Sequence, residues 1–237
     1  MYLTNINCSP VLVYVIIIFK EDTILNILKP QEIFFDKLEV KSLESLKSLE
    51  KDSIINKALL KNEENANFNM YDLSFEFCKF DTMNLQNIIF EKVSFNDVIF
   101  SNCNFSNCKF VDCYFSRCEF NCCKLTGSNL TSNRLFNVGF IETNANFINF
   151  TDASLDRILF KKTAIRNCYF SETSLKYVYF DEADLSLAQI FKTSLKDIDL
   201  SNSNLEGITV SLDDIKGAIV DQYQLTDLAF LLGVTVK

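Results

Sequence analysis

The chain has 237 residues but no histidine and no tryptophan, and it contains only 5 glycines and 2 prolines. Histidine is the commonest general base and the commonest metal ligand, so its absence argues against an enzyme or a metalloprotein. The sequence also has no Ser/His/Asp set, no glycine-rich phosphate loop and no metal motif. We therefore expect no catalytic residue, no cofactor and no metal.

The sequence also has no excess of basic residues. The net charge is −8, and it is spread as −2 over residues 1–65, −4 over residues 66–208 and −2 over residues 209–237. Proteins that bind nucleic acid usually carry a basic patch or stripe. We therefore expect no direct binding to nucleic acid.

A long hydrophobic run is the third absence. The apolar run Val11–Phe19 is too short to cross a bilayer, and the first residues lack the basic region of a secretory signal. The sequence therefore predicts a cytoplasmic protein with reduced thiols and no membrane association.

What the sequence does have is a period of five. From Phe75 to Leu205, every residue whose number is divisible by five is apolar, and Phe is the commonest among them. We call this position i. From Leu73 to Ser203, no residue at i−2 is charged, and most are Cys, Ser, Thr, Ala or Val. Two positions in each pentad therefore point inward, and charges occupy the other three.

Neither an α-helix nor a β-strand has a period of five. A chain that turns a corner in every pentad closes a square after four pentads. Such coils stack at about 4.8 Å with their backbones paired, and each coil buries its core against its neighbours. The period therefore predicts a solenoid.

The pattern resembles the pentapeptide repeat family, whose motif is A-(D/N)-L-x-x. In-phase examples are SNL at 128–130, ASL at 153–155, ADL at 183–185 and SNL at 203–205, whereas ANF at 145–147 is out of phase. The resemblance implies an all-β solenoid, a right-handed quadrilateral β-helix over residues 53–210. Residues 1–52 are then a partly irregular or helical flanking segment, and residues 211–237 a helix and strand cap.

Cysteines occupy i−2 positions along this array. The inward cysteines are Cys78, Cys103, Cys108, Cys113, Cys118, Cys123 and Cys168. We interpret them mainly as small buried free thiols. Two alternatives stay open: a metal site, for which no C-x2-C pair exists, and disulfides between neighbouring coils. Cys122 lies at an outward position, and we expect it to be the most reactive thiol.

The C-terminal segment departs from the period. Asp221 and Gln224 have the spacing of a capping box, and an apolar stripe follows them. The segment resembles the end of bacterial family members such as quinolone-resistance proteins, which implies a homodimer through the terminal helix. The candidate interface residues are Leu225, Leu228, Ala229, Phe230, Leu231 and Leu232.

The same resemblance implies a non-enzymatic protein that mimics DNA and binds DNA gyrase or topoisomerase IV. Candidate partner-binding acids are Asp72, Asp112, Asp152 and Glu172 in one column, and Asp181, Glu182 and Asp184 in a second area. The unbroken register lacks the loop insertions of the quinolone-resistance group. The alternative function is a protein–protein interaction scaffold with an unknown partner, and an enzyme is the least favoured hypothesis.

Overall fold

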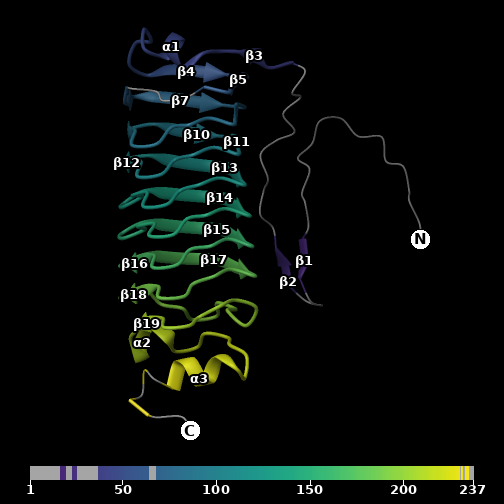
Figure 1. Ribbon diagram of the computed structural model, residues 1–237, viewed down its shortest axis with the longest axis vertical. Coiled ribbons are helices and arrows are strands. Elements are labelled where there is room, and N and C mark those ends of the chain that lie inside the picture. The colour runs from purple at the N-terminus through teal and green to yellow at the C-terminus, as the bar shows by residue number, and fades with distance from the viewer. Residues whose placement is uncertain are drawn as a thin grey trace, which may run out of the picture.

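The computed structural model describes residues 17–19, 23–25, 37–63, 68–229, 231, 233 and 234. Residues 37–63 and 68–229 build one rod of stacked coils, with β3 and α1 near one end and α3 near the other (Figure 1). All strand pairs in the described part of the rod are parallel. The predicted right-handed quadrilateral β-helix is confirmed.

The first and second sides of the rod share one 11-stranded sheet. The first side holds β4 (Ser53–Asn56), β7 (Leu73–Glu76) and β10 (Ser94–Asn96). The second side holds β3 (Glu39–Val40), β5 (Ala58–Lys61), β8 (Lys79–Asp81) and β11 (Ile99–Ser101). Four longer strands cover both sides: β13 (Tyr114–Asn121), β14 (Arg134–Ile141), β15 (Ser154–Lys161) and β17 (Ser174–Asp181).

The third and fourth sides are held by shorter contacts. Isolated bridges run along the third side from Asn84 through Asn104 to Asn204. The fourth side holds β6 (Met70–Tyr71), β9 (Ile89–Glu91), β12 (Lys109–Val111), β16 (Tyr169–Ser171), β18 (Gln189–Phe191) and β19 (Thr209–Val210). Bridges at Asn129 and Asn149 join β12 to β16.

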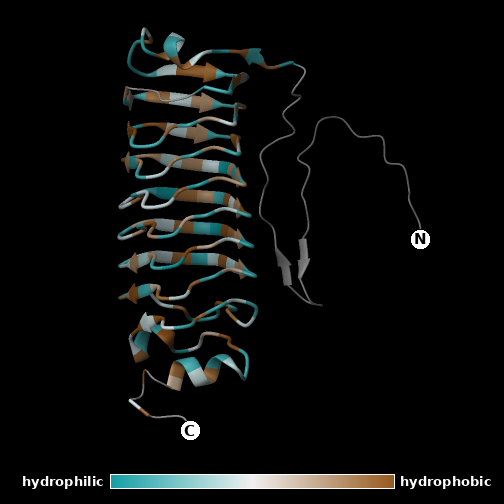
Figure 2. Ribbon diagram, in the orientation of Figure 1, coloured by the Kyte–Doolittle hydropathy of each residue, from teal (hydrophilic) through white to brown (hydrophobic). Residues whose placement is uncertain are grey.

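The register between coils is four pentads, as the period predicts. Phe95 pairs with Phe75 above it and with Phe115 below it, and the same offset recurs through β13, β14, β15 and β17. Because the offset is a whole number of pentads, identical positions lie over one another. Figure 2 shows the resulting alternation of hydrophobic and hydrophilic residues along the coils.

The core is a column of aromatic rings. Phe100 and Phe120 stack with ring centroids 4.5 Å apart, and Phe120 and Phe140 stack 5.0 Å apart at an interplanar angle of 4°. Rings on neighbouring sides of a coil meet edge to face, as Phe100 and Phe105 do. Both arrangements are favourable for aromatic pairs, so the phenylalanines fill the rod and tie each coil to the next.

The corners lie at position i+2, where the backbone is left-handed. Among the described residues, twenty-eight that are not glycine have positive φ. They recur at every fifth position wherever the rod is described from Asp52 to Asp197, and Gly127 takes one of these places. Asn and Asp tolerate this conformation best, and they supply many of the corners. Other corners hold side chains that do not favour it, such as Phe147, Tyr177 and Leu187.

The two ends carry the helices. Near the first coil, α1 (Leu43–Leu46) buries both of its leucines against the core. Beyond the last coils, α2 (Leu212–Ile215) and α3 (Gln224–Ala229) lie at the other end (Figure 1). A separate antiparallel pair is formed by β1 (Ile17–Phe19) and β2 (Thr23–Leu25).

Candidate functional site

The cysteines predicted to point inward are all buried, and all are free thiols. Most of them donate a hydrogen bond to a carbonyl group in the coil above. The Sγ of Cys108 lies 2.9 Å from the Leu85 carbonyl oxygen, and the Sγ of Cys113 lies 3.3 Å from that of Phe90. The thiols therefore form hydrogen bonds across coils as well as filling space.

Serine and threonine make the same bond where they occupy i−2. The Oγ of Ser128 donates to the Phe105 carbonyl at 2.6 Å, and the Oγ1 of Thr163 donates to that of Phe140 at 2.8 Å. Asn133 does so through its amide nitrogen, 2.7 Å from the Phe110 carbonyl oxygen. Sequence reasoning missed this role, although a signal was visible, because the side chains at i−2 are often small donors.

Burial raises the pKa of six of the seven inward thiols. Desolvation raises the pKa of Cys78 to about 11 and those of Cys108, Cys113 and Cys118 to about 12. Burial also raises the pKa of Cys168 and of Cys123, while a hydrogen bond from Cys123 lowers the pKa of Cys103 in the coil above. A thiol whose pKa is raised is a poor nucleophile at neutral pH, which holds for the inward cysteines other than Cys103.

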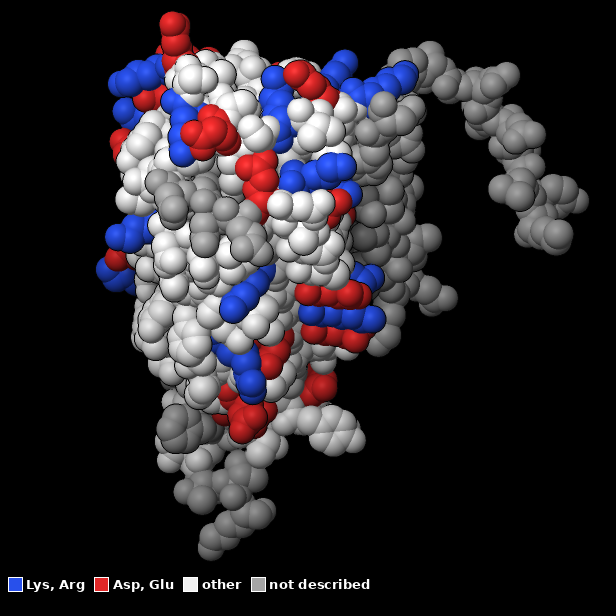
Figure 3. Space-filling view, turned by 45° about the horizontal axis from the view of Figure 1, so that its top comes forward, with Lys and Arg blue, Asp and Glu red and all other residues white. Residues whose placement is uncertain are grey.

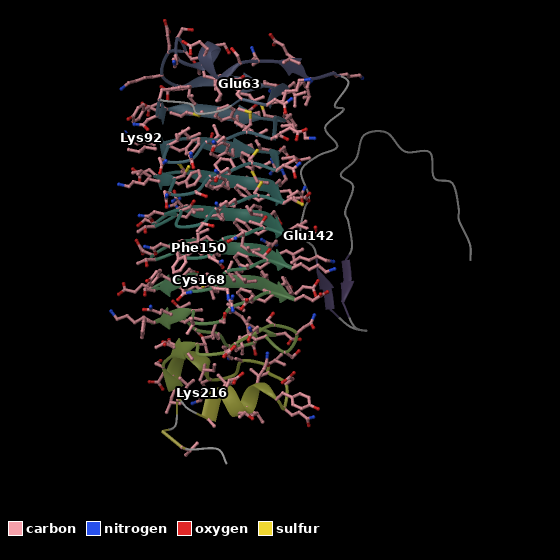
Figure 4. The ribbon with its side chains drawn as sticks, viewed as in Figure 1. Glu63, Lys92, Glu142, Phe150, Cys168 and Lys216 are labelled. Carbon is pink, nitrogen blue, oxygen red and sulfur yellow. The ribbon has the colours of Figure 1, made fainter. Side chains whose placement is uncertain are left out.

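Cys122 stands apart because it is exposed at a corner. Its Sγ lies 3.8 Å from a carboxylate oxygen of Glu142, one coil below. Figure 4 shows Phe150 and Cys168 inside the rod, whereas Lys92 and Glu142 lie at its edges. Among the residues that the structure describes, no group of three or more His, Cys, Asp or Glu residues could hold a metal ion.

The acids of the first proposed column lie at corners of four different coils, and Lys92 and Ser132 hold the same corner in two coils between them. Asp112 and Asp152 are exposed, and Asp152 accepts a hydrogen bond from Ser132 at 2.9 Å. Asp72 is half-buried and lies 3.7 Å from the Lys51 Nζ, whereas Glu172 lies 2.7 Å from the Lys192 Nζ. The carboxylate of Glu172 raises the pKa of Lys192. Half of the column is therefore paired with lysine.

The acids of the second proposed area are less available to a partner than those of the first column. Asp181 is only 8% exposed, lies 3.6 Å from the Lys161 Nζ and accepts a hydrogen bond from Asn202 at 3.0 Å. Asp184 lies 3.0 Å from the Arg166 Nε. Glu182 is the exposed acid of the three. Figure 3 shows basic and acidic side chains interleaved on the face it displays, in agreement with this pairing.

A pair of cross-coil contacts on the first two sides was not predicted. The Arg117 guanidinium donates to both carboxylate oxygens of Asp97, at 2.8 and 2.6 Å, and Asp97 is buried. The Arg157 guanidinium lies between two rings, 5.1 Å from the Phe136 centroid and 5.3 Å from that of Tyr177. Opposite charges four pentads apart were the sequence signal for the first contact.

The C-terminal cap is built by a reciprocal pair. Asp221 Oδ1 accepts a hydrogen bond from the Gln224 backbone at 2.8 Å, and Gln224 Oε1 accepts one from the Asp221 backbone at 2.8 Å. This is the capping box that the spacing predicts. The Gln224 Nε2 also donates to the Leu200 and Ser203 carbonyls at 2.7 and 2.6 Å, so one buried side chain closes the last coil.

The predicted dimer-interface residues divide into two groups. Leu225 is 57% exposed, whereas Leu228 and Leu231 are partly buried against the core and Ala229 is half-buried. Phe230 and Leu232 lie outside the described residues. Further exposed apolar side chains near this end are Leu212, Ile219, Tyr223 and Val234. One side of the stripe therefore packs against the core of the rod, and the other side is exposed to solvent.

Within the described part of the chain, no helix is long and apolar enough to cross a membrane. The helices are instead short elements at the two ends of the rod.

Comparison with known proteins connects this architecture to a family. A model of the pentapeptide repeat region matches residues 113–190, and a model of eight pentapeptide repeats matches residues 69–107. No curated protein matches the chain in sequence.

Similar solved structures were also found. Full-length QnrB1, a plasmid-mediated fluoroquinolone resistance protein, is 17% identical, with a TM-score of 0.37 over 77% of this chain and 100% of QnrB1. HetL, a pentapeptide repeat protein involved in heterocyst differentiation regulation from the cyanobacterium Nostoc, is 14% identical, with a TM-score of 0.28 over 77% of this chain and 83% of HetL. The two family models lie on the same five-residue period that builds the coils. The chain therefore belongs to the pentapeptide repeat family.

Proposed function

We propose that the chain is a non-enzymatic protein-binding rod that dimerises through its C-terminal end. The observation that carries the proposal is the cluster of exposed apolar side chains at that end, where Tyr223 is 77% exposed and Leu225 is 57% exposed. Exposed apolar clusters on a folded protein mark interaction sites. The rod itself presents interleaved charges, which favour specific protein contacts over a substrate pocket.

The dimer can be tested with one substitution. Leu225→Asp adds a charge to the exposed part of α3 without disturbing Leu228, which packs against the core. We expect light scattering at micromolar concentration to give a dimer for the wild type and a monomer for Leu225→Asp. Tyr169→Asp, at an exposed site on the fourth side, is the matched control and stays dimeric. A monomeric wild type contradicts the proposal.

A type II topoisomerase is the second candidate, as a partner that recognises the rod in place of DNA. Asp112 and Asp152 favour it, because they are exposed acids in one column and no ion pair among the described residues involves them. The C-terminal segment also resembles the end of quinolone-resistance members of the family. DNA gyrase and topoisomerase IV are therefore the enzymes to test.

The charge density of the rod limits how closely it can mimic duplex DNA. Residues 66–208 contain 17 acids and 13 bases, a net charge of −4. This part of the rod has about seven coils and a length of about 34 Å, over which duplex DNA carries about 20 negative charges. Mimicry of the whole duplex surface is thus not supported, and recognition has to depend on local acids and shape.

The test is a supercoiling titration with purified gyrase, with and without a fluoroquinolone. If the enzyme is a partner, the chain inhibits supercoiling or protects it from the drug at micromolar concentration or below. Asp112→Lys with Asp152→Lys then weakens the effect at least tenfold, whereas Glu172→Lys, whose carboxylate is already paired, has a smaller effect. If the chain has no effect on supercoiling at tens of micromolar, the topoisomerase is excluded as a partner and the proposal of a protein-binding rod is unaffected.

The free buried thiols suit a reducing compartment, so we propose that the protein lies in the cytoplasm.

A further inference from the structure

The fourth side of the rod differs from the other three sides because its outward residues carry no charge over five coils. These residues stand at i−1 and i+1 from Asn129 to Ser211, on the side that holds β16, β18 and β19 (Figure 1). On each of the other sides, three or four of the eight outward residues in the pentads centred from Leu135 to Leu205 are charged. The absence of charge is therefore a property of this side and not of the rod.

The corner between the third and fourth sides continues the uncharged surface. Over the same coils this corner holds Gly127, Phe147, Asn167, Leu187 and Gly207. Each of the other three corners holds at least two charged residues over these coils. We call the outward residues of the fourth side from Asn129 to Ser211, together with this corner, the neutral face.

Two residues of the corner are held against their backbone preference. Phe147 and Leu187 have φ of +60° and +59°, and their side chains are 52% and 53% exposed. A left-handed backbone costs such residues roughly 1–2 kcal/mol, and an exposed side chain recovers little of this by packing. Asn107 holds the same corner in an earlier coil, where the residue type suits the backbone. Because strained residues cluster at functional sites, Phe147 and Leu187 indicate that a ligand uses this corner.

Three exposed aromatic side chains cross the neutral face on a diagonal. Phe147, Tyr169 and Phe191 follow one another at intervals of 22 residues, which is one coil and two further residues. Each step along the diagonal is therefore about 8 Å. Tyr169 is 37% exposed and Phe191 is 43% exposed. The three rings form a line on which an extended ligand can lie.

Amide groups lie beside the middle ring of this line. Asn129 and Asn149 are stacked one coil apart, and Asn149 is stacked in turn on Tyr169. The Oδ1 of each asparagine accepts a hydrogen bond at 2.9 Å from the backbone N–H two residues later. These bonds orient the amides, and their Nδ2 atoms donate to no group in the part of the chain that the structure describes. The neutral face therefore presents ordered donors next to an aromatic ring.

The size and the charge of the neutral face limit what can bind to it. Five coils are about 24 Å long and five strand residues span about 16 Å, so the face measures roughly 400 Å². A stable protein–protein interface buries about 800 Å² of each partner, which is twice as much. The face also has no basic residue with which to neutralise the phosphates of a nucleic acid. A thin, neutral and extended ligand is what remains.

We propose that the neutral face binds a neutral linear glycan, a chain of hexose rings. The C–H face of a sugar ring is apolar and packs on an aromatic side chain, while its hydroxyl groups exchange hydrogen bonds with amides and hydroxyls. The diagonal of rings supplies the first kind of contact, and Asn129 and Asn149 supply the second. A proline-rich peptide also packs on aromatic rings, but it has no hydroxyl groups to meet the amides. The inference does not depend on the proposed dimer or on the topoisomerase.

Affinity electrophoresis of the full chain tests the binding. Native gels contain hydroxyethylcellulose, laminarin or soluble starch, three neutral glucans that differ in linkage. We expect at least one of them to retard the wild type, and Tyr169→Ala with Phe191→Ala to weaken the association at least tenfold. Tyr114→Ala, which removes a tyrosine of similar exposure from the first side, is the matched control and leaves the retardation unchanged. The proposal is overturned if no glucan retards the wild type, or if the double variant is retarded equally.

A second measurement places a fluorophore on the face without shortening a side chain. Because the chain has no tryptophan, Phe191→Trp introduces a single reporter on the neutral face, and Tyr114→Trp introduces one on the first side as the control. We expect the glucan that retards the chain to shift the emission of the tryptophan at position 191 and not that at position 114. Decaproline should shift neither. A shift at position 191 with decaproline and not with the glucan overturns the proposal in favour of a proline-rich peptide.

Discussion

The thiol of Cys108 donates to the carbonyl oxygen of Leu85, 2.9 Å away in the coil above. Because Ser128 and Thr163 make the same contact, a hydroxyl can replace the thiol. We expect Cys108→Ser to change the free energy of unfolding by less than about 1 kcal/mol, and Cys108→Ala to cost about 1–2 kcal/mol through the lost hydrogen bond and the lost volume. Urea unfolding followed by circular dichroism compares the two variants. A more stable alanine variant would show that the bond does not contribute.

The aromatic column predicts a large difference between two phenylalanines. Phe115 is fully buried and stacks on Phe95 at 4.9 Å, whereas Phe147 is exposed at a corner with φ of +60°. Phe115→Asp places a charge without a partner in the core, and we expect it to abolish the cooperative thermal transition. Phe147→Asp is the control, and it should melt at or slightly above the wild-type temperature because Asp tolerates a left-handed backbone. Similar melting of both variants would contradict the inward assignment.

Two ion pairs between neighbouring coils should differ in their contribution to stability. Asp97 is buried and paired with Arg117, whereas Glu172 and Lys192 are both exposed. Arg117→Met removes the guanidinium from a buried carboxylate and should cost about 3 kcal/mol. Lys192→Met should leave the urea midpoint nearly unchanged, because solvent screens an exposed pair. Equal urea midpoints for the two variants would show that the buried ion pair contributes no more to stability than the exposed one.

The closure of the last coil depends on Gln224. Gln224→Ala removes both bonds to the Leu200 and Ser203 carbonyls and the bond to the Asp221 backbone. We expect a loss of about 2–3 kcal/mol, measured by urea unfolding. Gln222→Ala, at an exposed neighbouring site, is the matched control. Hydrogen exchange should show the loss of protection starting in the coil of Leu200.

The buried thiols predict how stability depends on pH. In the unfolded chain a thiol ionises near its usual pKa of 9.0, whereas burial raises the pKa of Cys108, Cys113 and Cys118 to about 12. The unfolded state therefore binds fewer protons than the folded state between pH 9 and 12, and stability falls as pH rises through this window. Each thiol contributes a slope of up to about 1.4 kcal/mol per pH unit.

Thermal melts at pH 8 and pH 10.5 measure this slope. The triple variant Cys108→Ser, Cys113→Ser, Cys118→Ser removes these three titrations and leaves the lysines and tyrosines in place as an internal control. Its melting temperature should fall less over the same interval than that of the wild type. Parallel curves would mean that the thiols do not titrate on unfolding in this window.

Much of the fold could be predicted because two inward positions recur without a break. Phe at i and small side chains at i−2 identify the faces of each pentad, and the length of a coil follows from four corners. The left-handed corner at i+2 could not be read from residue types, since Phe147, Tyr177 and Leu187 occupy it against their local preference. A left-handed residue costs roughly 1–2 kcal/mol, so the packing of the coil imposes the corner.

The candidate site was harder to predict, because exposure depends on neighbours in other coils. Asp181 lies at an outward position, yet it is buried and contacts Lys161 and Asn202. The apolar stripe of α3 could be predicted from the sequence. Which of its residues are exposed could not, because the exposure of Leu225 and the packing of Leu228 on the core depend on the geometry of the last coil.

The constant register of four pentads also governs how such a chain can change in length. A single-residue insertion would turn every later inward side chain outward, whereas duplication of four pentads adds one coil with the same cross-section. The rod can therefore lengthen in evolution by whole coils, about 4.8 Å at a time, without redesign of its core. The length of the rod is therefore set by the number of coils and not by the sequence of any single coil.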